Sequence, residues 1–255
     1  MKISLVIMAA GMGSRYGGSK QVDGIGPHRE ILMEYSIYDA LRAGFNRVVF
    51  IIKPEMEEMM RGLCGGYLEK KTAADGGPVE VAYAFQDFSS VPAFYAIPEG
   101  RTKPFGTVHA LLCAERAVHG PFCVINADDY YGIDAYRTVY RELTALPETG
   151  KGVMVGYELA KTASLHGTVS RGLCAVENGK LKSVREALKV QLYPDGTLRD
   201  LAEDRPLAPD TVTSMNFWGF APGIFPELRR YFEDFLRAEA GDNPKAECLL
   251  PMMVG

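Results

Sequence analysis

Residues Ser4 to Lys20 give the clearest indication of the fold: Ser-Leu-Val-Ile-Met-Ala-Ala-Gly-Met-Gly-Ser-Arg-Tyr-Gly-Gly-Ser-Lys. Its first part, residues 4–9, is an almost continuous apolar run, which is typical of a strand buried on both faces of a parallel sheet. Its second part is rich in glycine, which lets backbone N–H groups approach an anion closely. The stretch therefore predicts an α/β fold with an anion-binding loop after its first strand.

Strand and helix patterns alternate beyond that loop. Ile31, Tyr35, Tyr38 and Leu41 fall at helical spacing, and Gly44 is a plausible stop. Further strands are expected at 48–52, 79–85, 122–126, 152–158 and 215–221, and further helices at 55–63, 107–118, 134–146 and 226–240. This order predicts βαβ units and a parallel sheet.

The second half has a different pattern. Residues 167–193 read as short strands, with turn residues at 177–180 and at 194–196 that are typical of antiparallel hairpins. We therefore predict a Rossmann-like three-layer α/β fold, with a mixed, mostly parallel central sheet and a smaller antiparallel lobe. Residues 1–255 would form one domain, with a nucleotide-binding half at 1–150 and an acceptor-binding half at 151–255.

Composition narrows the class of protein. Hydrophobic residues make up 47% and charged residues 24%, as in ordinary soluble globular proteins, and the net charge of -4 argues against a nucleic-acid or membrane partner. The five cysteines are odd in number and form no CxxC pair, and Cys113, Cys123 and Cys174 stand in apolar strings. They predict buried free thiols in a reducing compartment, the cytoplasm. The apolar residues 249–255 either pack as a terminal element or precede a further piece.

Two well-known phosphate motifs do not fit the first loop. A dinucleotide fingerprint needs a third glycine where Tyr16 stands, and an acid after the second strand, where Lys53 stands. A Walker A loop needs glycine before its lysine, but Ser19 precedes Lys20. Two glycines and the cations Arg15 and Lys20 remain, which suit a triphosphate whose charge is neutralised as pyrophosphate leaves. The alternative is a connector whose cations face water.

A Gly106-Thr107 pair opens the helix expected at 107–118. Backbone N–H groups at a helix N-terminus have no partner within the helix and are available to a ligand. The plainer interpretation makes Thr107 the N-cap of that helix. Arg101 and Lys103, just upstream, would then be solvated charges rather than phosphate contacts.

Asp128 and Asp129 follow the buried strand expected at 122–126. Ligands of open α/β sheets bind at the carboxyl ends of strands, and Mg²⁺ is commonly held by one or two carboxylates together with substrate phosphates. The alternative is that one of the two aspartates caps the helix beginning near Asp134.

Residues Ala9-Ala10-Gly11-Met12-Gly13-Ser14-Arg15, with Lys20 downstream, resemble the signature of sugar-phosphate nucleotidyltransferases, and the resemblance extends over nearly the whole chain. These enzymes couple an NTP to a sugar 1-phosphate and release pyrophosphate. The resemblance implies a GT-A-like fold, Mg²⁺ at Asp128, and catalytic roles for Arg15, Lys20 and Asp128. It implies nucleotide contacts for Ala9, Ala10, Gly11, Gly13, Ser14, Gly106 and Thr107.

Three segments of the second half resemble that family's acceptor-binding motifs. They are His166-Gly167-Thr168-Val169, Val184-Arg185-Glu186 and Met215-Asn216-Phe217-Trp218-Gly219. The resemblance implies that Gly167, Glu186 and Asn216 bind the acceptor. Gly167 in a turn, Glu186 exposed to solvent, and Phe217 and Trp218 in the core are the purely structural interpretations.

The implied partners are an NTP and a small phosphorylated acceptor, with homo-oligomer formation left open. The second pKa of the acceptor phosphate is about 6, so this group is largely ionised at neutral pH and needs no general base to act as nucleophile. Two other functions stay open at this point. One is a regulatory protein that binds an NTP without turnover. The other is a transferase acting on a non-sugar phosphate such as phosphocholine.

Overall fold

The computed structural model describes residues 1–11, 24–147, 152–238, 243 and 245–255. The chain forms two compact units. Unit 1 comprises Met1–Val153 and Trp218–Leu249, and unit 2 comprises Met154–Phe217 and Leu250–Gly255. The single domain with halves 1–150 and 151–255 stays a prediction.

Unit 1 is built on a mostly parallel sheet. Strands β1 (Ser4–Met8), β2 (Arg47–Ile52), β3 (Glu80–Phe85) and β4 (Phe122–Asn126) are parallel and lie in the order β3-β2-β1-β4. The end of β10 (Val212–Phe220) pairs antiparallel with β4 through residues 218–220. Strands β1, β2 and β4 are almost entirely buried, as their continuous apolar runs predict. The predicted mixed, mostly parallel α/β sheet is confirmed.

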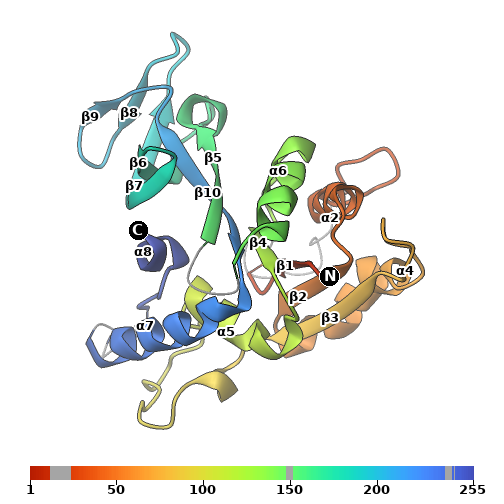
Figure 1. The fold of residues 1–255 in the computed structure, drawn as a ribbon. Coiled ribbons are helices and arrows are strands. Elements are labelled where there is room, and N and C mark those ends of the chain that lie inside the picture. Colours follow the sequence, from red (N-terminus) through yellow and green to blue (C-terminus); the bar gives the residue numbers. More distant parts are fainter. Residues whose placement is uncertain (12–23, 148–151, 239–242, 244) are drawn as a thin grey trace. The chain divides into compact units, whose positions relative to one another are not determined.

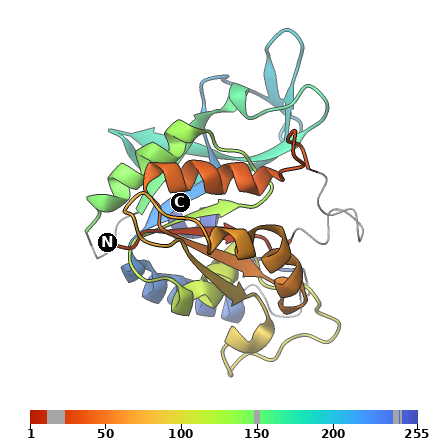
Figure 2. The same cartoon turned by 90° about the vertical axis from the view of Figure 1, so that its right-hand side faces the viewer.

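Helices cover both faces of this sheet. Figures 1 and 2 show α2 (Leu32–Ala43) and α6 (Ile133–Thr144) on one face, and α5 (Thr107–Ala114) and α7 (Phe225–Ala238) on the other. Helix α2 ends as expected, because Gly44 adopts a left-handed φ of 119° and its N–H caps the carbonyls of Ala40 and Leu41. The remaining helical segments are η1 (Pro54–Met56), α3 (Glu57–Met60), the π-helical η2 (Arg61–Gly65), α4 (Gly66–Leu68), η3 (Phe88–Ser90), η4 (Glu115–Ala117) and η6 (Pro222–Ile224).

The residues whose spacing predicted α2 are not all buried. Met33, Ile37 and Ala40 are buried, whereas Tyr38 is 58% exposed. Both sets of residues have helical spacing, so periodicity located the helix correctly but did not distinguish its two apolar stripes.

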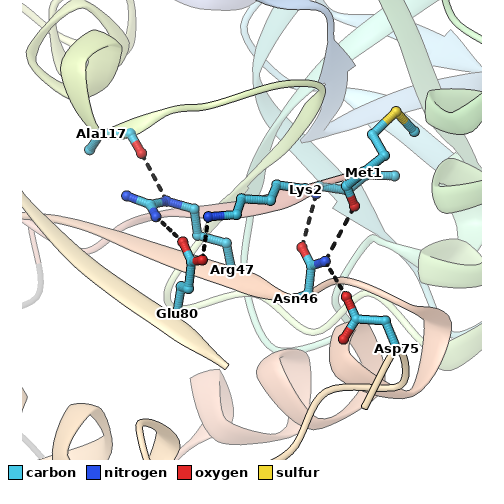
Figure 3. Close-up of polar contacts among 8 residues, drawn as sticks. Met1, Lys2, Asn46, Arg47, Asp75, Glu80 and Ala117 are labelled. Atoms are coloured by element: carbon cyan, nitrogen blue, oxygen red, sulfur yellow. Dashed lines mark hydrogen bonds and ion pairs between the residues drawn. The ribbon is translucent and has the colours of Figure 1, made fainter. Parts of the chain in front are cut away.

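The amino-terminal edge of the sheet is closed by polar contacts. In Figure 3 the Glu80 carboxylate is bound by both Lys2 and Arg47, and Asn46 donates to Asp75. The hydrogen bond from Lys2, followed by that from Arg47, lowers the pKa of Glu80 against the opposing effect of burial. These contacts tie β1, β2 and β3 together at the end opposite their carboxyl termini.

Unit 2 is antiparallel. The first part of β10 pairs with β6 (Val169–Glu177), followed by β7 (Lys180–Leu192), β8 (Leu198–Asp200) and β9 (Arg205–Leu207). β5 (Gly152–Glu158) pairs with β10, and η5 (Leu159–Lys161) follows it. The β6–β7 hairpin turns at Asn178 and Gly179, whose φ angles of 52° and 71° are those of a type I′ turn. The core of unit 2 consists of Leu159, Leu173, Ala187, Val190 and Leu198.

The apolar residues 249–255 include helix α8 (Leu250–Val254), which packs against β7. Cys64, Cys123 and Cys248 are buried, whereas Cys113 and Cys174 are half-buried. Of the three thiols expected to be buried, only Cys123 is fully so. In the described part of the chain, no helix has the length and apolarity needed to cross a membrane.

Candidate functional site

A cavity of about 480 Å³ lies within unit 1. Each of the four parallel strands supplies residues just beyond its carboxyl end: Gly11 after β1, Lys53 after β2, Gln86 after β3 and Asp128 after β4. This is the edge at which open α/β sheets bind ligands. The strand order β3-β2-β1-β4 places Gln86 and Asp128 three strand spacings apart, roughly 14 Å. The cavity is thus long enough for an elongated ligand.

Asp128 faces the cavity at the β4 end. The N–H of Ala127 donates to the carbonyl of Met8 at 3.3 Å, so Asp128 is the first residue beyond the β1–β4 ladder. The neighbouring Asp129 accepts a 2.7 Å hydrogen bond from the side-chain amide of Asn126. Helix α6 is capped by Gly132, so the interpretation of either aspartate as its cap is wrong. Asp128, and not Asp129, lines the cavity.

The donor set around Asp128 fits a divalent cation shared with a ligand. Within the described ranges, no group of three or more His, Cys, Asp or Glu side chains is placed to hold a metal. One carboxylate in a cavity suits Mg²⁺, which keeps several other ligand positions for water and substrate phosphates.

The start of α5 requires a glycine. Gly106 is the N-cap, with a left-handed φ of 86°, so the expectation that Thr107 caps this helix is wrong. A Cβ at Gly106 would lie 2.8 Å from the carbonyl oxygen of Cys248. The carbonyl of Gly106 accepts a 3.1 Å hydrogen bond from Nε2 of Gln86. Gly106 and Thr107 both line the cavity, so the structure brings them together with Gly11 and Asp128.

Residues 245–248, here called the strap, run alongside the start of α5. The N–H of Cys248 donates to the carbonyl of Phe105 at 2.7 Å, and the N–H of Val108 donates to the carbonyl of Cys248 at 3.1 Å. Glu247, the residue before Cys248, lines the cavity.

Arg101 fixes the strap and is not a solvated charge as expected. The side chain is 6% exposed, and its guanidinium donates to the carbonyls of Lys103 at 2.9 Å and Ala246 at 2.7 Å. It also lies over the Phe105 ring, at 3.6 Å from the ring centroid. Burial lowers the pKa of Arg101, and the carbonyl oxygens accept the hydrogen bonds that water would otherwise provide.

The first loop is described only at its start. The N–H of Ala9 donates to the carbonyl of Ile51 at 2.8 Å and continues the ladder past β1. Ala10 and Gly11 line the cavity. Gly13, Ser14, Arg15 and Lys20 lie outside the described residues.

The three expected acceptor-binding residues all belong to unit 2. Gly167 lies in a bend with a φ of 147°. Gly172 on β6 pairs with Glu186 on one side and Ser214 on the other, so Glu186 lies two strand spacings from Ser214, roughly 10 Å. Burial raises the pKa of Glu186, and the positive charge of Arg171 opposes this shift.

Asn216 interrupts β10 with a left-handed φ of 59°. It follows Ser214, which pairs with β6, and precedes Trp218, which pairs with β4. Such a conformation in a residue other than glycine stores backbone strain and is frequent at functional sites. Phe217 and Trp218 are buried, as the structural interpretation expected.

Lys53, Gln86 and Glu247 also line the cavity and were not among the predicted site residues. Lys53 and Gln86 directly follow expected strands, so the rule that placed Asp128 would also have found them. Glu247 had no such signal, because only the packing of the strap brings it to the cavity.

The comparisons with known proteins agree with this geometry. The family model for nucleotidyl transferases matches residues 4–193. No curated protein sequence matches the chain.

Three solved structures share the fold. A protein described as a glucose-1-phosphate thymidylyltransferase from Bacillus anthracis, in complex with a sucrose, is 17% identical, with 89% of this chain and 74% of that chain covered and a TM-score of 0.56. The inositol-1-phosphate CTP transferase from T. maritima is 9% identical, with 98% and 78% covered and a TM-score of 0.56. A UDP-glucose pyrophosphorylase complexed with UDP-glucose is 16% identical, with 98% and 84% covered and a TM-score of 0.54.

The fold is a mixed α/β fold with a cavity at the carboxyl edge of its parallel strands. The extent of the family match makes the assignment specific: the chain belongs to the nucleotidyl transferase family.

Proposed function

We propose that this protein is a Mg²⁺-dependent nucleotidyltransferase, which couples an NTP to a sugar 1-phosphate and yields an NDP-sugar and pyrophosphate. The observation that carries this proposal is the joint presence of Gly11 and Asp128 in one cavity, after the adjacent parallel strands β1 and β4. The first supplies a glycine backbone for phosphates, and the second supplies a carboxylate for a cation.

The reaction requires alignment and charge neutralisation rather than a general base. A phosphate oxygen of the acceptor attacks the α-phosphorus of the NTP, the new P–O bond forms, and the bond to pyrophosphate breaks. In this proposal Arg15 and Lys20 neutralise the departing pyrophosphate. Asp128 holds Mg²⁺, which supplies positive charge to the phosphate oxygens when bound.

Nucleotide contacts are assigned to Ala9, Ala10, Gly11, Gly13, Ser14, Gly106 and Thr107. Gly167, Glu186 and Asn216 are assigned to the acceptor. The half-buried carboxylate of Glu186 suits an acceptor that carries several hydroxyl groups, because a carboxylate accepts hydrogen bonds only. The named substrates of the three structural neighbours, glucose 1-phosphate, inositol 1-phosphate and UDP-glucose, also carry several ring hydroxyls.

Pyrophosphate release by the full chain tests this function. The assay combines Mg²⁺, each common NTP, and a panel of sugar 1-phosphates with inositol 1-phosphate and phosphocholine as non-sugar acceptors. We expect release with a sugar 1-phosphate, and a loss of at least about tenfold in Asp128→Asn, equivalent to ~1.4 kcal/mol in transition-state binding. Asp134→Asn, which changes an exposed carboxylate on α6, serves as the matched control.

Three results would contradict the proposal. Rates within threefold of wild type for Asp128→Asn would remove that residue from the site. Turnover with inositol 1-phosphate or phosphocholine alone would move the enzyme to a non-sugar acceptor. Thermal stabilisation by NTP and Mg²⁺, without pyrophosphate release from any acceptor, would identify a regulatory nucleotide-binding protein.

A further inference from the structure

The two strands that flank β1 are each followed by a charged residue that lines the cavity. Strand β4 pairs with one side of β1 and is followed by Asp128, and β2 pairs with the other side and is followed by Lys53. The backbone of Ala10 and Gly11, which continues β1, also lines the cavity. An acidic and a basic residue therefore follow strands on opposite sides of the start of the first loop.

The strand ladders fix where the backbone of Lys53 lies. On one side of β2, the N–H of Ala9 donates to the carbonyl of Ile51 at 2.8 Å. On the other side, the N–H of Gln86 donates to the carbonyl of Ile52 at 2.8 Å. Lys53 is therefore the first residue beyond both ladders, one strand spacing, about 5 Å, from the continuation of β1.

The chain turns immediately after Lys53. Pro54 is the first residue of η1, and the carbonyl of Lys53 accepts a 2.9 Å hydrogen bond from the N–H of Met56. Lys53 itself is half-buried and has an extended backbone, with φ of -80° and ψ of 151°. The turn holds the backbone of Lys53 at the cavity, while the flexible four-carbon side chain lets its ammonium group reach a ligand.

Lys53 has no acidic partner in the part of the chain that the structure describes. None of the ion pairs among those residues includes it. A half-buried ammonium group loses part of its hydration, and an anion bound beside it offsets that cost.

Lys103, the other lysine of the lining, lies in a region of mixed charge. The Arg101 guanidinium donates to the carbonyls of Lys103 and Ala246, so it connects Lys103 to the strap. The strap also brings the carboxylate of Glu247 to the cavity. Both signs of charge thus occur at the strap, whereas β2 contributes a positive charge alone.

The residue type at this position favours phosphate over ribose. In dinucleotide-binding folds an acid near the end of the second strand accepts hydrogen bonds from ribose hydroxyls. Lys53 stands at the corresponding place, and its ammonium group is a donor that carries positive charge. Hydrogen bonds from an ammonium group to a phosphate oxygen are charge-assisted and roughly twice as strong as neutral ones.

We infer that Lys53 binds the phosphates of the NTP, with its ammonium group donating to phosphate oxygens beside the backbone of Ala10 and Gly11. The phosphates are then held between the cation at Asp128, on the β4 side, and the ammonium group of Lys53, on the β2 side. The inference rests on the proposed function, since it takes the ligand of the cavity to be an NTP.

Equilibrium binding to the full chain tests this inference separately from turnover. Calorimetry first identifies the NTP that the wild type binds most tightly among ATP, CTP, GTP, UTP and dTTP, each with Mg²⁺. The Kd of that NTP, of its nucleoside and of inorganic tripolyphosphate is then measured for the wild type, Lys53→Gln and Lys53→Arg.

We expect Lys53→Gln to weaken both the NTP and tripolyphosphate by roughly tenfold, because each loses a charge-assisted hydrogen bond, and to leave the nucleoside within about threefold. Lys53→Arg keeps the positive charge and should stay within about threefold of the wild type for all three ligands. Lys70→Gln, at an exposed position of unit 1 outside the cavity lining, should match the wild type. Urea unfolding should give the same midpoint for all variants.

Weaker binding of the NTP with unchanged binding of tripolyphosphate would overturn the inference, because Lys53 would then contact the base or the ribose. Unchanged binding of the NTP in Lys53→Gln, an equal loss in Lys70→Gln, or no binding of any NTP by the wild type would also overturn it. The expected pattern of binding, without pyrophosphate release by the wild type, would refute the proposed function while leaving Lys53 as a phosphate-binding residue.

Discussion

The Arg101 guanidinium donates a 2.7 Å hydrogen bond to the carbonyl oxygen of Ala246, a residue 145 positions later in the chain. This contact connects the loop before α5 with the strap. The side chain is almost fully buried, and its remaining donors reach the carbonyls of Lys103, Pro104 and Asn243. The position of Glu247 in the cavity therefore depends on Arg101, which does not itself line the cavity.

Arg101→Lys should destabilise unit 1 although it preserves the charge. An ammonium group has no planar fork and cannot satisfy these carbonyls together, so buried acceptors lose their donors. We expect a loss of about 3 kcal/mol in the free energy of unfolding by urea. Arg116→Lys, at an exposed position on η4, is the control and should change stability by less than about 0.5 kcal/mol. An equal, small effect of both substitutions would show that the carbonyls find other donors.

Two N-cap glycines allow a matched test of the close approach at α5. Gly106 and Gly132 begin α5 and α6 with φ angles of 86° and 83°, but only Gly106 has a backbone atom within reach of an added Cβ. Gly132→Ala should cost about 1–3 kcal/mol, because its ψ of 145° puts this residue in a backbone region that is open essentially only to glycine. Gly106→Ala should cost at least about 1 kcal/mol more, because the strap must move away. Urea unfolding measures both losses in the free energy of unfolding. Equal losses would mean that the strap moves away from the added Cβ without an energetic penalty.

The backbone of unit 1 was largely predictable, and the reason is visible in individual strands. Residues 122–126 were placed at the observed bounds of β4, because this apolar run ends at a clear break. The carboxyl end of a parallel strand is a fixed position in such folds, which pointed to Asp128 and Asp129 together, and the family resemblance favoured Asp128.

Long-range packing was not predictable. Arg101 has the appearance of a surface charge in the sequence, and its burial depends on carbonyls of residues 243 and 246. Glu247 reaches the cavity for the same reason. Spacing located α2 but did not reveal which of its residues meet the sheet, and Tyr38, one of the residues at helical spacing, is exposed.

His109 should make stability depend on pH. Burial lowers its pKa to about 4, against an unfolded value of 6.5, and nearby Arg101 lowers it further while Asp87 opposes the shift. Its Nδ1 accepts from the N–H of Phe105 at 3.4 Å, so a proton at Nδ1 would face another donor.

Between pH 6.5 and about 4 the unfolded chain therefore binds a proton that the folded chain does not. We expect the free energy of unfolding to be level above pH 6.5 and to fall by roughly 3 kcal/mol toward pH 4 through this residue. His109→Gln should remove that part of the slope in urea titrations at several pH values. His119→Gln, at an exposed position, should retain it. An unchanged slope in His109→Gln would assign the pH dependence to other groups.

Asn216 allows its backbone and side-chain roles to be separated. Its φ of 59° suits glycine or asparagine and disfavours a β-branched residue. Asn216→Gly should keep the free energy of unfolding within about 0.5 kcal/mol of wild type, whereas Asn216→Val should lower it by about 1–2 kcal/mol. If the amide binds the acceptor, Asn216→Gly should raise the KM for the sugar 1-phosphate about tenfold while the KM for the NTP stays constant, because a lost hydrogen bond weakens ground-state binding of one substrate only. An unchanged acceptor KM in the stable glycine variant would show that the residue serves the turn in β10 alone.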